Sequence, residues 1–155
     1  MLSVDAALNQ THPWNLQTAR GEVSCRTVLH ATNGYASYLL PELVGQKEIV
    51  PTRGQVIGVR SNASSDAVSR AGWGAGFEAN ARRYWFPRPV KHEDDTRNPL
   101  ILIGGGKEVT GPTYERYISD DSVVREDVTK VLRDFLPEIF PSLYPVHADV
   151  EYEWV

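Results

Sequence analysis

The stretch that decides the fold is residues 28–55, VLHATNGYASYLLPELVGQKEIVPTRGQ. It begins with a short apolar run, turns a polar corner at Thr32-Asn33-Gly34, and continues through a proline-interrupted segment. A second extended run starts at Pro51. The residues before this stretch predict short strands, and those after it predict a separate antiparallel sheet with one helix.

The residues around the corner have distinct local patterns. Residues 14–18 alternate apolar and polar, and Arg20-Gly21 then predicts the tight turn of a hairpin. Residues 27–31 are apolar or β-branched at nearly every position, which is typical of a strand covered on both faces, often in a parallel sheet. Residues 37–43 predict a short helical segment that tolerates a proline in its first turn.

The second half predicts a hairpin and one helix. Residues 81–87, ARRYWFP, form a β-prone aromatic run, and residues 100–103, LILI, form a buried strand that ends in three glycines. Together they predict a hairpin with a long loop. Residues 70–80 predict irregular structure, and residues 146–155 alternate again as a strand does.

The clearest helix is predicted over residues 122–136, where valine, leucine and phenylalanine recur at three- and four-residue steps. Acidic and hydroxyl residues offer N-terminal caps, and a proline closes the segment. These are Asp120, Asp121, Ser122 and Pro137.

Composition narrows the class of protein. The chain has 155 residues, is 41% hydrophobic, and carries a net charge of −4, which argues against a protein that mainly neutralises phosphates of a nucleic acid. Cys25 is the single cysteine, which fits a reducing compartment and a quiet, half-buried thiol. No apolar run approaches the roughly 20 residues that cross a membrane, and no secretory signal is visible. We therefore expect an intracellular protein, cytoplasmic or peroxisomal, that binds neither nucleic acid nor membrane.

Several motifs invite a chemical interpretation and also have a structural one. Gly104-Gly105-Gly106 lacks the spacing of a phosphate loop and is better explained by positive φ or close backbone approach. The four histidines lie at no metal-ligand spacing, so no metal site is predicted. Arginines among the aromatic residues of 82–88 suggest either a single-stranded nucleic acid or anion site, or a sheet with aromatics on one face and arginines at its rim. The negative net charge favours the sheet.

Arg53 lies in a Pro-x-Arg-Gly-Gln segment at the start of an otherwise apolar strand. An unpaired charge there would be costly. Arg53 is therefore expected either to pair with a carboxylate of the protein or to face a cleft and hold an anionic ligand, for which its planar fork is well shaped. The sequence leaves both interpretations open.

Four motifs in succession, VLHATNGYASYLLPEL, IVPTRGQVIGV, RRYWFPRP and LILIGGGKE, resemble the FAD-dependent oxidoreductases of the D-amino-acid oxidase superfamily. The likeness covers nearly the whole chain and is nearest to fungal-type members similar to sarcosine and glycine oxidases. It implies that Ala31, Thr32, Asn33 and Gly34 lie near FAD. It also implies hydride transfer from a C–N bond of an amine or amino-acid substrate to the flavin.

The resemblance implies an α+β fold in which strands of a partial FAD-binding domain join a mostly antiparallel substrate-domain sheet with one main amphipathic helix. Residues 1–48 would belong to the FAD-binding domain, residues 49–147 to the substrate domain, and residues 148–155 to the truncated start of a return to the first. Arg53, Gln55 and Tyr84 are candidate substrate-cleft residues, with no catalytic step assigned.

The chain departs from the family in lacking the G-x-G-x-x-G fingerprint of its N-terminal dinucleotide-binding unit. We therefore expect an internal fragment of such an enzyme that is inactive alone. The alternatives are a non-catalytic relict and a small α+β binding module.

Overall fold

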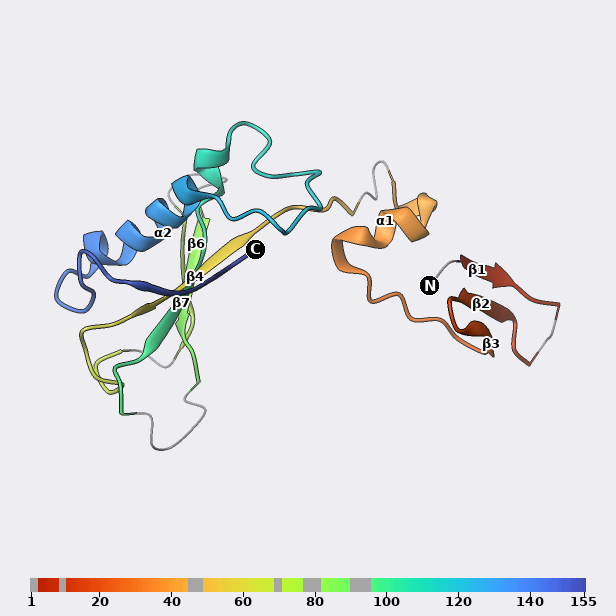
Figure 1. Cartoon of the computed structure of the whole chain (residues 1–155), viewed down its shortest axis with the longest axis horizontal. Helices are drawn as coiled ribbons and strands as arrows, with labels where there is room; N and C mark the ends of the chain where they lie inside the picture. The colour runs from red at the N-terminus through yellow and green to blue at the C-terminus, as the bar shows by residue number, and fades with distance from the viewer. Residues whose placement is uncertain (1–2, 9–10, 45–48, 69–70, 77–81, 90–95) are drawn as a thin grey trace. The chain divides into compact units, whose positions relative to one another are not determined.

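The computed structural model describes residues 3–8, 11–44, 49–68, 71–76, 82–89 and 96–155. The chain forms two compact units, Met1–Pro51 and Thr52–Val155 (Figure 1). The first contains a three-stranded antiparallel sheet, and the second contains a five-stranded sheet whose strand pairs are all antiparallel. With two antiparallel sheets and few helices, the chain has the predicted α+β class.

The sheet of the first unit is a meander of β1 (Ser3–Ala6), β2 (Trp14–Thr18) and β3 (Gly21–Cys25). The predicted hairpin is confirmed, because β2 pairs with β3 from Trp14 to Thr18. The turn between them requires a glycine at position 21, because its φ of 124° is allowed for glycine and strained for other residues.

The segment that follows β3 corrects one prediction. Residues 27–31 form no strand, and the side chain of Leu29 is 90% exposed. An apolar run forms a strand only where a partner strand satisfies its backbone hydrogen bonds. Among the described strands of this unit, none pairs with residues 27–31. The helical segment predicted over residues 37–43 is confirmed as two short pieces, α1 (Ala36–Leu39) and η2 (Pro41–Leu43). A further short helix, η1 (Asn33–Tyr35), was not predicted and lies in the polar corner before them.

The sheet of the second unit has the strand order β5-β6-β7-β4-β8. Its strands are β4 (Gln55–Arg60), β5 (Trp73–Gly76), β6 (Arg82–Pro87), β7 (Leu100–Gly105) and β8 (Val150–Trp154). The predicted hairpin of the aromatic run with the LILI strand is confirmed as β6 against β7.

One feature of this sheet differs from expectation. The irregular structure predicted around residues 73–76 is wrong, because β5 pairs there with β6. Its glycines lack the β-prone side chains by which a strand is recognised, and its cross-strand neighbours supply the packing instead. The predicted last strand is confirmed as β8, which pairs with β4 at the edge of this sheet. The division of the chain at residues 48 and 147 stays a prediction.

Helix α2 (Glu126–Ile139) covers one face of the sheet (Figure 1). Its buried side chains pack against isoleucines and valines of β4 and β7, and this contact forms the core. The core residues on the three elements are Ile57, Val59, Ile101, Ile103, Val128, Leu132, Phe135 and Leu136. Fully burying one such side chain stabilises a fold by about 1.5–3 kcal/mol.

The bounds of α2 correct the predicted helix at both ends. The helix begins after Arg125, so Val124 lies outside it and is 44% exposed. It also continues past Pro137, which lies inside the helix, and it closes with a bond from Phe140 N–H to the carbonyl of Leu136. Proline removes one donor near the end of the helix without stopping the last turn.

Candidate functional site

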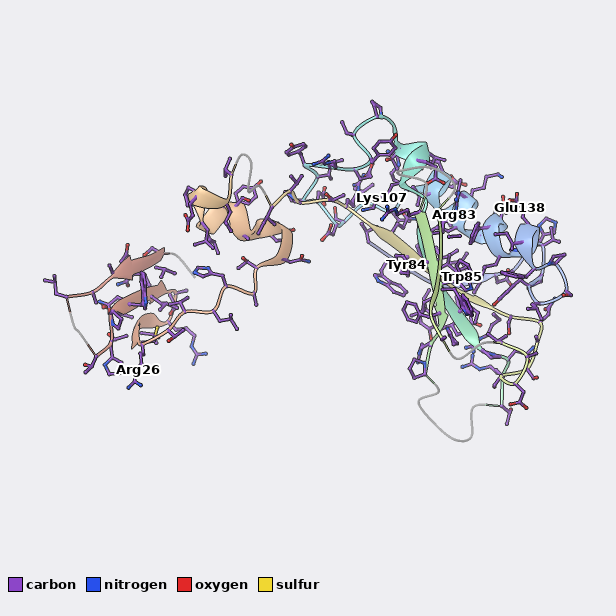
Figure 2. All side chains as sticks on the ribbon, turned by 180° about the vertical axis from the view of Figure 1, so that it is seen from behind. Arg26, Arg83, Tyr84, Trp85, Lys107 and Glu138 are labelled. Atoms are coloured by element: carbon purple, nitrogen blue, oxygen red, sulfur yellow. The ribbon has the colours of Figure 1, made fainter. Side chains whose placement is uncertain are left out.

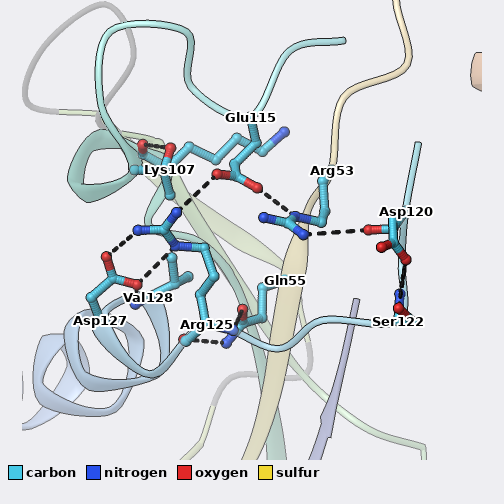
Figure 3. A network of polar contacts seen from close by, with 10 residues as sticks. Arg53, Gln55, Lys107, Glu115, Asp120, Ser122, Arg125, Asp127 and Val128 are labelled. Carbon is cyan, nitrogen blue, oxygen red and sulfur yellow. Dashed lines mark hydrogen bonds and ion pairs between the residues drawn. The ribbon is translucent and has the colours of Figure 1, made fainter. Parts of the chain in front are cut away.

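Arg53 pairs with a carboxylate of the protein. Its Nε donates to Glu115, and the two side chains are only 11% and 6% exposed (Figure 3). Glu115 also accepts from Arg125 Nη1 at 3.4 Å, so two guanidinium groups share one buried carboxylate. Glu115 has a φ of 64°, a strained value that the ion pairs help to hold.

Gln55 caps helix α2. Its Oε1 accepts from the backbone N–H of Arg125 at 2.9 Å, and its Nε2 lies 3.0 Å from the Arg125 carbonyl. The same Nε2 lies 2.8 Å from Thr129 Oγ1 and 3.0 Å from Glu153 Oε1. This amide replaces the predicted capping residues, because the helix has no side-chain cap of its own.

Asp120, predicted to cap the helix, instead closes a local turn. Its Oδ1 accepts from the N–H and the hydroxyl of Ser122 at 2.9 and 2.6 Å, and these bonds lower the pKa of Asp120. Asp127, in the first turn of α2, bonds Arg125, which lowers the pKa of this carboxyl too. Arg53 and Gln55 are thus committed to a network that joins β4 to the start of α2.

The face of the second sheet opposite α2, called here the open face, carries two rows of side chains. One row crosses the strands as Gly74, Tyr84, Gly104, Val56 and Trp154. The next row consists of Phe86, Leu102, Gly58 and Tyr152. The four aromatic side chains are between 37% and 48% exposed, so a large apolar area is available for contact.

Glycines make room for these aromatic rings. A Cβ on Gly104 would lie 2.2 Å from Cζ of Tyr84, so the tyrosine ring lies directly over this glycine. A Cβ on Gly58 would lie 3.4 Å from Tyr152. Tyr84 and Phe86 stack with their ring centroids 6.4 Å apart. The open face is therefore a flat aromatic surface rather than a filled core.

The arginines and aromatics of β6 divide between the two faces. Figure 2 shows Tyr84 and Trp85 on opposite sides of the strand, with Arg83 on the side of Trp85. Arg83 pairs with Glu108 and lies 4.9 Å from the Phe135 ring, on the α2 side. The expectation that the aromatics share one face is wrong, because the strand alternates through the whole run.

Arg88 lies close to the aromatic rings of the open face. The guanidinium of Arg88, just beyond β6, lies 5.7 Å from the centroid of the Tyr152 ring. At the edge of the sheet Arg60 forms an ion pair with Glu151 at 2.6 Å. An aromatic surface with an arginine beside it can hold a flat ring and attract an anionic group.

Gly105 and Gly106 provide the positive φ and the close approach predicted for the glycines that follow the LILI run. Gly105 has a φ of 119°, and a Cβ there would lie 2.1 Å from the carbonyl oxygen of Arg82. Gly106 has a φ of 72° and lies close to Val128 and Leu132 of α2. These contacts allow β7 to end against β6 and turn into η3 (Lys107–Thr110).

The predicted cofactor residues lie in the first unit. The hydroxyl of Thr32 is buried and has no hydrogen-bond partner among the described residues, and Asn33 has a φ of 45°. Gly34 approaches Pro51, where a Cβ would lie 3.0 Å from Cα. Ala31 is exposed. An orphaned hydroxyl beside exposed backbone fits a polar group of a cofactor, so these residues are compatible with FAD.

Within the described part of the chain, histidine, cysteine and carboxylate side chains form no group suited to a metal ion. In the same residues no helix is long and apolar enough to cross a membrane.

Residues 3–155 match the family described as FAD dependent oxidoreductase. The chain therefore belongs to this family of flavin-dependent oxidoreductases. Comparison with curated proteins and with solved structures finds no match to either.

Sequence reasoning missed two parts of the site. Glu115 is a buried partner of two arginines, but nothing in its sequence context distinguishes it from an exposed carboxylate. Tyr152 and Trp154 do carry a signal, since their two-residue spacing places them on one face of the predicted last strand.

Proposed function

We propose that the open face is the substrate-side wall of an FAD-dependent oxidase that acts on the C–N bond of an amine or amino acid. Membership of the flavin-dependent family supports the reaction type. The observation that carries the proposal is the exposed row of Tyr84, Gly104, Val56 and Trp154, which offers a flat surface with one free hydroxyl. When bound, FAD supplies the hydride acceptor.

The residues of the open face would bind and orient the substrate. The aromatic rings exclude water from the substrate's apolar part, and the Tyr84 hydroxyl can donate to or accept from its polar group. Arg88 favours a substrate with a carboxylate, because its guanidinium can bind both oxygens at once. An amino acid therefore fits this face better than a simple amine.

Ala31, Thr32, Asn33 and Gly34 are proposed to contact FAD, with the Thr32 hydroxyl as the polar contact. Since the sequence lacks the G-x-G-x-x-G fingerprint, retention of flavin by this chain is itself an informative measurement. The chain would be purified, incubated with FAD and filtered. A bound flavin spectrum is expected for the wild type and a weaker one for Thr32→Val, which keeps the shape of the side chain.

Turnover would be measured as H₂O₂ release with amino acids, N-methyl amino acids and amines that lack a carboxylate. Tyr84→Phe and Arg88→Gln should reduce kcat/KM for the carboxylate-bearing substrates. Tyr144→Phe is the matched control, because Tyr144 is buried in the core on the α2 side. Flavin binding with an unchanged kcat/KM in Tyr84→Phe and Arg88→Gln would refute the proposal. Absence of both flavin binding and H₂O₂ release would show that this chain does not act alone and would leave its membership of the family intact.

A further inference from the structure

A cavity lies on the α2 side of the second sheet, close to the edge strand β5. Its volume is about 390 Å³, within the range of small-molecule binding sites. Ten described residues line it, and none of them carries a charge. Large aromatic side chains contribute to the wall from β5, from β6 and from the segment just after α2, including Trp73, Trp85 and Phe140.

Two tryptophans of the wall come from neighbouring strands. Trp73 and Trp85 are directly opposite each other in the β5–β6 pair, so their side chains lie on the same face of the sheet. The ring of Trp85 contacts Phe135 and Phe140, with centroids 5.5 and 6.3 Å apart. Trp73 forms no ring contact with another described residue and is 55% exposed. Cross-strand aromatic pairs usually pack together, so the separation of these two rings leaves an apolar space between the strands unfilled.

Another wall of the cavity is a loop held by backbone hydrogen bonds. Ala67 and Val68 line the cavity from the loop after β4, and their N–H groups both donate to the Ser64 carbonyl, at 3.0 and 3.2 Å. The Asn62 N–H donates to the Leu143 carbonyl at 2.8 Å and ties this loop to the segment after α2. The walls are therefore held in place without a ligand, which lowers the cost of binding one.

The residues of the wall define the chemistry of a ligand. A flat ring can stack on an indole, and such aromatic contacts add to the gain from burying apolar surface. A charged group would leave water without a partner, because no lining residue offers an opposite charge. A flexible aliphatic chain would lose more conformational freedom on binding than a rigid ring. The cavity therefore favours a rigid, uncharged aromatic ligand.

We propose that this cavity binds a small, flat, uncharged aromatic molecule that contacts Trp73 and Trp85. The cavity is separate from the open face, because Tyr84 and Trp85 lie on opposite sides of β6 (Figure 2). FAD itself does not fit the chemistry of this wall, since its diphosphate is negatively charged. The ligand is thus a second molecule, bound on the side of the sheet away from the proposed substrate.

The test uses two probes of nearly the same shape: acetonaphthone, which is neutral, and naphthoate, which is an anion at neutral pH. The whole chain would be titrated with each probe and followed by N–H correlation NMR. Each of the four tryptophans gives one indole signal, which Trp→Phe variants assign. Trp154 is the internal control, because it lies on the open face and is 43% exposed, so a ligand that adheres to any exposed indole would shift its signal too.

Acetonaphthone is expected to shift the signals of Trp73 and Trp85 saturably and to leave that of Trp154 in place, and naphthoate should bind several-fold more weakly. Ala67→Leu should weaken acetonaphthone binding several-fold, because Ala67 is exposed and a larger side chain there fills the cavity without entering the core. Ala6→Leu is the matched control, at an exposed alanine of β1, and should leave binding unchanged.

Three results would each overturn the proposal: an equal shift at Trp154, equal affinity for the two probes, or unchanged binding in Ala67→Leu. Displacement of acetonaphthone by FAD would also overturn it, because the cavity would then be part of the flavin site. The titration needs neither flavin nor turnover, so this proposal can fail while the oxidase proposal holds, and the reverse.

Discussion

Gln55 provides the sharpest test of how the second unit is held together. Its amide oxygen accepts from the Arg125 N–H, and the two hydrogens of its Nε2 are shared among three acceptors: the Arg125 carbonyl, Thr129 and Glu153. Gln55 itself is only 5% exposed. Gln55→Leu keeps the size of the side chain and removes the one bond that the amide accepts here and the two that it can donate at once. Each contributes about 0.5–1.5 kcal/mol, so we expect a loss of about 3 kcal/mol in the free energy of unfolding.

The measurement is equilibrium urea unfolding, followed by hydrogen exchange of the α2 amides to show that the loss occurs there. Gln17→Leu on β2 is the matched control, because Gln17 is a half-buried strand residue whose side chain forms no hydrogen bond with another described residue. It should change stability by less than about 0.5 kcal/mol. A loss below about 1 kcal/mol for Gln55→Leu would refute the assignment of Gln55 as the cap of α2.

Three further outcomes follow from the geometry. Gly105→Ala should cost about 2 kcal/mol more than Gly104→Ala in urea unfolding, because Gly105 meets backbone at positive φ whereas Gly104 meets only the movable Tyr84 ring. Tyr84→Ala should change stability by less than about 1 kcal/mol, since the ring is 46% exposed; a larger loss would make it a packing residue. The hydrogen bond from Lys130 lowers the pKa of Asp134. The small stabilising effect of this pair is therefore present above about pH 4 and is lost on acidification. Asp134→Asn should slightly weaken the dependence of unfolding on acid pH, and an unchanged dependence would contradict this.

The strands of the second unit were predictable wherever their side chains carry the β pattern. The aromatic run of β6 and the aliphatic run of β7 both give strands at the expected places. β5 was hidden because Gly74 and Gly76 leave no side-chain pattern to detect. Residues 27–31 show the opposite error, because their composition favours a strand that the described structure does not form.

The site was less predictable because its contacts join residues far apart in the sequence. Arg53 and Glu115 are separated by 62 positions, and nothing local distinguishes Glu115 from an exposed carboxylate. Asp120 and Ser122 form the kind of local hydrogen bond that the sequence predicts, but they do so outside the helix. The amide of Gln55 caps the helix at Arg125, three residues after Ser122. Local sequence propensity cannot predict a capping side chain that comes from another strand.

The Gln55 amide also bears on the order in which the second unit folds. Gln55 and Glu153 are 98 positions apart, and β4 lies between β7 and β8 in the finished sheet. During synthesis β4 can pair with β7 while its other edge stays open until β8 leaves the ribosome. Such long-range closure is slow, and an open central strand is exposed to wrong partners meanwhile. The outer edge of β4 is therefore the part of this sheet that waits longest for its partner strand, since β8 is the last of the five strands in chain order.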